Sequence, residues 1–105
     1  MRLTIDINEA DGADSDPSSF SWCRIGETIT NSDGRGPGIL SAEEEARFRI
    51  GVYKMTFYTK EYFDDSGTET FYPYVEVVFR ITDVSQHYHI PLLISPFGYS
   101  TYRGS

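Results

Sequence analysis

Short stretches in which apolar and polar residues alternate dominate this chain of 105 residues. Alternation with a period of two places one set of side chains on each face of a strand, so such stretches predict half-buried β-strands. The clearest stretch is residues 51–59, in which Tyr53, Met55 and Phe57 share the face predicted to be core. Similar patterns predict strands at residues 3–7, 20–26, around 40, 74–82 and 87–95.

Turn residues separate the predicted strands. Residues 31–38 combine Asn, Asp, Pro and Gly and predict a tight turn, because Asn and Asp bond to nearby backbone and Gly accepts positive φ. Residues 9–19 have no apolar periodicity and predict an exposed loop. Residues 83–86 predict a hairpin connection between the last two long strands.

Helical signals are few. Residues 60–65, ended by Ser66-Gly67, predict the one short helix. Ser41 followed by three Glu permits a helical turn, although a run of acids is more typical of a solvated surface. With strands predominating, the chain is predicted to be all-β, a single antiparallel β-sandwich domain over residues 1–105.

Charge and composition exclude several classes of partner. The formal net charge is −7, and residues 1–45 hold ten acids against three bases. Phosphate binding requires clustered Lys and Arg, so nucleic acid is not expected as a partner. No apolar run is long enough to span a membrane, and nothing near Met1 resembles a signal peptide, so we expect a soluble intracellular protein. Cys23, the one cysteine, is predicted to be a buried small hydrophobe.

The last predicted strand and the tail after it carry most of the polar chemistry. A lone strand histidine is more often structural than catalytic, but His89 is accompanied by Arg103 near the end and by Arg35 in the Gly/Pro turn. A neutral imidazole accepts a proton near physiological pH, and guanidinium groups hold planar anions. This combination suits water attack on a small polar ring, which residue types alone do not name. His87 and His89 share a strand face but lack a third ligand at suitable spacing, so no metal site is predicted.

Five segments of the chain form a recognisable set of motifs: TNSDGR at 30–35, GVYKM at 51–55, FYPYVEVVF at 71–79, HIPLLISP at 89–96 and YRGS at 102–105. Together they resemble the 5-hydroxyisourate hydrolase family, the transthyretin-like enzymes of urate degradation. The resemblance runs over nearly the whole chain, and the terminal Tyr-Arg-Gly-Ser is its most specific element. Transthyretin carriers share the fold but have a different tail and no histidine at the position of His89.

The resemblance implies a transthyretin-like sandwich of two antiparallel sheets with one short helix, assembled as a homotetramer with substrate sites between dimers. It implies hydrolysis of 5-hydroxyisourate to 2-oxo-4-hydroxy-4-carboxy-5-ureidoimidazoline without a cofactor, in the peroxisome or the cytoplasm. By matching motif, Arg35 and Tyr102 would bind the substrate, His89 would activate or position water, and Arg103 with Ser105 would complete the polar wall.

One departure from the family concerns the start of the chain. Family members begin with an additional strand bearing Thr-His-Val-Leu, whose histidine belongs to the site, and Met1 stands just before the second strand of that pattern. The domain is therefore expected to lack one strand between two retained ones, which leaves backbone groups without partners. Two alternatives to an active hydrolase follow: a transthyretin-type binding protein for a small aromatic ligand, or an inactive truncated form.

Overall fold

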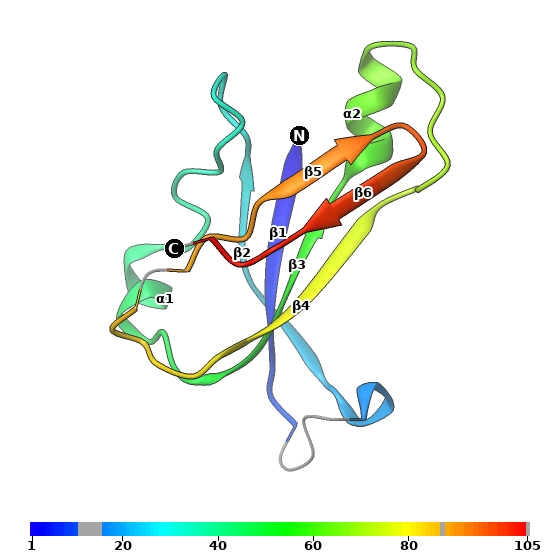
Figure 1. The fold of residues 1–105 in the computed structure, drawn as a ribbon. Helices are drawn as coiled ribbons and strands as arrows, with labels where there is room; N and C mark the ends of the chain where they lie inside the picture. The colour runs from blue at the N-terminus through cyan, green and yellow to red at the C-terminus, as the bar shows by residue number, and fades with distance from the viewer. Residues whose placement is uncertain (11–15, 87, 105) are drawn as a thin grey trace.

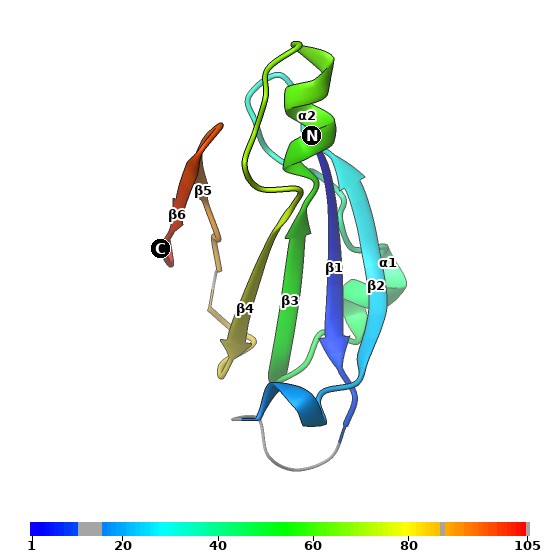
Figure 2. The same ribbon diagram turned by 90° about the vertical axis from the view of Figure 1, so that its right-hand side faces the viewer.

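The protein has two layers of antiparallel strands in a computed structural model that describes residues 1–10, 16–86 and 88–104 (Figure 1). A four-stranded sheet has the order β2-β1-β3-β4, and β5 and β6 form a separate two-stranded ribbon. Figure 2 shows the ribbon standing opposite one face of the sheet. The predicted all-β antiparallel sandwich is confirmed. The strands are β1 (Arg2–Asn8), β2 (Trp22–Ile29), β3 (Gly51–Phe57), β4 (Val75–Ile81), β5 (Leu92–Ser95) and β6 (Gly98–Thr101).

The core lies on the sheet face that is turned toward the ribbon. Residues directly opposite one another across β1, β3 and β4 form apolar rows: Leu3 faces Phe57, which faces Val75, and Ile7 faces Tyr53. All five side chains are buried. Cross-strand apolar neighbours of this kind are the basic stabilising unit of a sheet. The alternation at residues 3–7 and 51–57 therefore predicted the core face correctly.

Two α-helices accompany the strands in the described part of the chain, one more than expected. The helix predicted at residues 60–65 is present as α2 (Thr59–Asp65), which Gly67 follows with a φ of 69°. The second helix, α1 (Ala42–Ala46), begins where the Ser41 side chain accepts a hydrogen bond from the Glu44 amide at 3.2 Å. Three Glu in its first turn complement the positive end of the helix dipole, so the acid run is helical as well as solvated. No helix in the described part of the chain is long and apolar enough to cross a membrane.

The second strand continues past the point where it was expected to end. Gly26 lies inside β2, at a bulge where the register with β1 shifts between Ile5 and Asp6. A Cβ on Gly26 would lie 1.9 Å from the Ile39 carbonyl oxygen, so the glycine marks a close backbone approach rather than a strand end. The strand expected around residue 40 is reduced to a single bridge between Leu40 and Gly26.

The predicted hairpin at residues 83–86 is wrong. In the described residues β4 pairs with β3 and β5 pairs with β6, so this segment carries the chain from the sheet to the ribbon. Alternation identifies a strand but does not name its partner. The strand predicted at 87–95 is shortened to β5, in which Leu93 is 58% exposed. The tail aromatics Phe97 and Tyr102 are also exposed.

The outer face of the sheet is polar, yet its centre is buried. Asp6 on β1 accepts a hydrogen bond from Arg24 on β2 at 2.8 Å, and Lys54 on β3 lies 3.3 Å from Glu76 on β4. Beside these pairs Thr4 is fully buried, and its hydroxyl has no hydrogen-bond partner among the described residues. β1 is thus buried on both faces, whereas alternation had predicted a half-buried strand.

We expect Gly26→Ala to lower the free energy of unfolding by about 3 kcal/mol, because the added methyl group collides with the Ile39 carbonyl. Chemical denaturation followed by circular dichroism measures the change. Gly51→Ala is the matched control, since its Cβ would meet only the Ile7 side chain at 3.8 Å. Equal stability of the two variants would contradict the close approach at Gly26.

Thr4→Val is expected to raise the free energy of unfolding by about 1 kcal/mol, because it replaces a buried hydroxyl without a partner by a methyl group of similar shape. Thr4→Ala removes the methyl group too and is expected to destabilise the sheet. The denaturation midpoint should therefore rise for Thr4→Val and fall for Thr4→Ala. A lower midpoint for Thr4→Val would mean that the hydroxyl is hydrogen-bonded in solution.

Candidate active site

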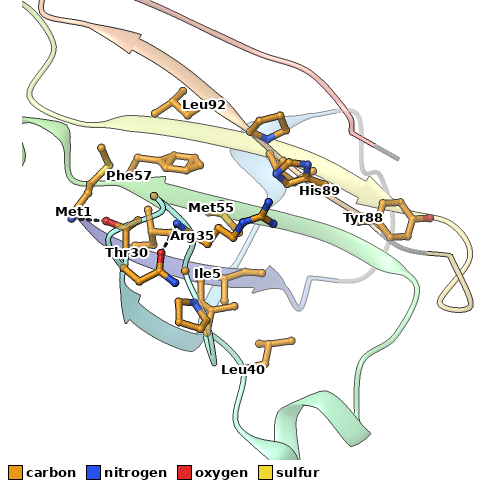
Figure 3. Close-up of a pocket in the computed structure, with 18 of the residues that line it drawn as sticks. Met1, Ile5, Thr30, Arg35, Leu40, Met55, Phe57, Tyr88, His89 and Leu92 are labelled. Carbon is orange, nitrogen blue, oxygen red and sulfur yellow. Dashed lines mark hydrogen bonds between the residues drawn. The ribbon is translucent and has the colours of Figure 1, made fainter.

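A cavity of about 730 Å³ lies between the sheet and the segment that leads into the ribbon. Its floor is the apolar inner face of the sheet, and its rim is formed by the turn after β2 and by residues 88–92 (Figure 3). The space combines an apolar base with a polar edge, as small-molecule sites commonly do. The floor includes Leu3, Ile5, Met55, Phe57 and Phe79.

Arg35 is carried to this rim by the turn after β2. The side-chain oxygen of Asn31 accepts hydrogen bonds from the amides of Asp33 at 2.9 Å and Arg35 at 3.1 Å. The Asn31 amide donates to the Arg35 carbonyl at 2.7 Å, and Gly34 supplies the positive φ of 75° that the turn requires. One asparagine therefore fixes the backbone of Arg35 from both sides, and the predicted tight turn is confirmed.

The Arg35 side chain is exposed, and its guanidinium has no hydrogen-bond or ion-pair partner among the described residues. Figure 3 shows it extending toward the imidazole of His89, which approaches from the opposite side of the rim. Both residues line the cavity. The structure thus brings together the two residues that the sequence predicted as catalytic, from segments far apart in the chain.

His89 belongs to the segment just before β5, where a single antiparallel bridge joins it to Gly104. The Gly104 amide donates to the His89 carbonyl at 2.7 Å. His89 is exposed at the rim rather than buried in the core, so its side chain is accessible to a molecule in the cavity.

The other predicted site residues lie in the tail. Tyr102 is 56% exposed and does not line the cavity. Arg103 donates a hydrogen bond to the Gln86 side chain at 2.7 Å and stacks over the ring of Tyr88 at 4.5 Å. Ser105 lies outside the described residues. The structure therefore does not place Tyr102 or Arg103 beside Arg35.

Metal ligation and thiol chemistry find no support in the described residues. No group of three His, Cys, Asp or Glu side chains is gathered there, and His87 lies outside them. Cys23 is exposed instead of buried, because β2 is an edge strand. The negative charge of Glu9 raises the pKa of the Cys23 thiol, so its thiolate is disfavoured.

Sequence reasoning missed two residues that lie near the site, because Gln86 and Tyr88 were given no role. Asn31, in contrast, belongs to the predicted turn, whose Asn and Asp were expected to bond to nearby backbone. The only signal for Tyr88 was its position between two histidines, and nothing in the sequence paired it with Arg103. Such contacts join segments that are distant along the chain, so strand periodicity does not reveal them.

The geometry suits general-base chemistry on an anion. An accessible imidazole can take a proton from water, and a guanidinium opposite it that has no partner among the described residues can stabilise negative charge on the molecule under attack. The apolar floor fits a flat ring better than a long polar chain.

Comparison with known proteins agrees with this chemistry. The family described as HIUase/Transthyretin matches residues 2–104. A 5-hydroxyisourate hydrolase of Mus musculus is 49% identical over 84 residues, which cover 80% of this chain and 69% of the relative. A probable 5-hydroxyisourate hydrolase of Caenorhabditis elegans is 45% identical over 84 residues, which cover 80% of this chain and 60% of the relative.

Solved structures give the same result for the fold. Transthyretin from Sparus aurata superposes with a TM-score of 0.80 at 30% identity, covering 98% of this chain and 80% of that one. This chain spans about 60 to 69% of the length of the two relatives above, and the family model matches it over residues 2–104. The chain therefore belongs to the HIUase/Transthyretin family.

Proposed function

We propose that this chain hydrolyses 5-hydroxyisourate to 2-oxo-4-hydroxy-4-carboxy-5-ureidoimidazoline, a step of urate degradation, without a cofactor. The observation that carries the proposal is the approach of Arg35 and His89 across one rim of the cavity (Figure 3). The names of the mouse and nematode relatives support the same substrate.

In the proposed reaction, His89 accepts a proton from water while the water oxygen bonds to a ring carbonyl carbon. Negative charge develops on the carbonyl oxygen, and the Arg35 guanidinium stabilises it. The ring carbon–nitrogen bond then breaks, and the departing nitrogen takes the proton from His89. The electron pair of the broken bond stays on nitrogen, so the reaction needs no redox partner. The resemblance implies substrate-binding roles for Tyr102, Arg103 and Ser105, of which Arg103 is held instead against Gln86 and Tyr88.

We expect His89→Ala and Arg35→Ala each to lower kcat/KM by on the order of a hundredfold or more, since each removes a base or a charge that acts in the transition state. The assay follows the decay of freshly generated 5-hydroxyisourate and subtracts its spontaneous rate. Arg47→Ala is the control, because Arg47 is an exposed arginine beside α1 that pairs with Glu44. Unchanged turnover in either site variant would remove that residue from the mechanism.

The same assay decides between hydrolysis and simple binding. A wild-type rate no faster than the spontaneous decay would contradict the proposed activity. Saturable binding of an iodinated thyronine under those conditions would favour a carrier of small aromatic ligands in its place.

We also propose that the chain assembles as a homotetramer, in the cytoplasm or the peroxisome. Large apolar side chains such as Leu93, Phe97 and Tyr99 are exposed on or beside the ribbon, and β6 has one open edge in the described part of the chain. Open edges and exposed apolar groups are usually covered by another chain. Sedimentation equilibrium should give four times the chain mass of 12.0 kDa, and a monomeric mass at micromolar concentration would contradict the assembly.

A further inference from the structure

The Arg103 side chain is held at two points, the side chain of Gln86 and the ring of Tyr88. Its Nη2 donates a hydrogen bond to Gln86 Oε1 at 2.7 Å, and its guanidinium carbon lies 4.5 Å from the centre of the Tyr88 ring. A cation over an aromatic face is attractive even at exposed sites. Arg103 is not among the residues that line the cavity. Its charge is therefore engaged by the protein rather than directed at the space in front of Arg35.

The Tyr88 ring that Arg103 contacts is itself held in place by hydrogen bonds to its hydroxyl group. Its hydroxyl oxygen accepts hydrogen bonds from the Thr82 amide at 3.4 Å and the Asp83 amide at 3.2 Å, at the end of β4. Although burial acts in the opposite direction, these bonds and the Arg103 charge lower the pKa of the Tyr88 phenol. The ring thus connects the sheet on one side with the tail on the other.

Gly104, the next residue, lies directly against His89. The bond from its amide to the His89 carbonyl fixes the two backbones at 2.7 Å. A Cβ on Gly104 would lie 2.6 Å from His89 Nδ1 and 3.0 Å from His89 Cβ and Cγ. Contacts under 3.0 Å essentially never occur for a real Cβ, so any side chain here would displace the imidazole. The bare backbone of Gly104 therefore forms one wall of the place in which the ring sits.

We propose that Arg103 and Gly104 form a latch that orients the His89 imidazole, with Tyr88 and Gln86 holding the latch closed. Arg103 is thereby a positioning residue that acts through Gly104 and His89, not a group that contacts substrate. The catalytic part of this inference rests on the proposed hydrolase function, whereas the structural part concerns the position of one ring. A displacement of about 1 Å at a catalytic group costs on the order of a hundredfold in rate, so such a latch matters for turnover.

The position of the ring can be measured without any substrate. The chain has two histidines, so long-range proton–nitrogen NMR spectra show two imidazoles, and His87→Gln assigns them. We expect Arg103→Gln and Gly104→Ala each to shift or broaden the His89 signals. Arg103→Lys keeps a cation near Tyr88 and should give a smaller change, and it replaces Arg103→Gln if that variant fails to fold.

Two variants serve as matched controls for the spectra. Gly98→Ala adds a methyl group at the start of β6, where its Cβ would meet only the Ser95 hydroxyl at 3.6 Å. Arg47→Gln removes an arginine charge that lies beside α1. Both should leave the His89 signals in place. His89 signals that stay unchanged in Arg103→Gln or in Gly104→Ala would overturn the latch.

Kinetics separate positioning from substrate contact. For Arg103→Gln we expect kcat to fall about tenfold or more while KM stays within about twofold, because a misplaced base slows the chemical step without removing a binding contact. A raised KM with unchanged kcat would show that Arg103 binds substrate and would overturn the positioning role. If the wild-type protein does not hydrolyse 5-hydroxyisourate, the proposed function fails, and the spectra alone decide whether the latch exists.

Discussion

The rest of the structure depends on β1, which is hydrogen-bonded along both edges and buried on both faces. β2 and β3 flank it, its inner side chains form the floor of the cavity, and its outer Asp6 accepts the hydrogen bond from Arg24. The seven residues of β1 thus bury apolar area on one face of the sheet and hold a paired charge on the other. The turn that carries Arg35 and the segment that carries His89 both border the cavity whose floor this strand helps to form.

Sequence alone predicted the features that depend on neighbouring residues. The alternation at 51–57 identified Tyr53 and Phe57 as core, and the Asn and Gly residues at 31–38 identified the turn that presents Arg35. The helix at 59–65 followed from its Ser-Gly stop. In each of these places local chemistry and the final fold agree, as is expected for sequences that fold reliably.

Features that depend on distant segments were not predicted. The residues at 83–86 have the composition of a hairpin turn, yet they cross from the sheet to the ribbon, because β4 already pairs with β3. Gly26 has the composition of a strand end, yet it lies inside β2, where the Ile39 carbonyl packs against its backbone. Similarly, the contact of Arg103 with Tyr88 joins two segments that share no periodic pattern.

Arg35 and His89 belong to different layers: the first follows β2 of the sheet, and the second precedes β5 of the ribbon. A molecule that contacts both therefore bridges the two layers, and its binding free energy is linked to how firmly they hold together. By the same linkage, a substitution that loosens the layers weakens binding even where it touches no ligand. The affinity for a molecule at this rim therefore depends on the distance between the two layers.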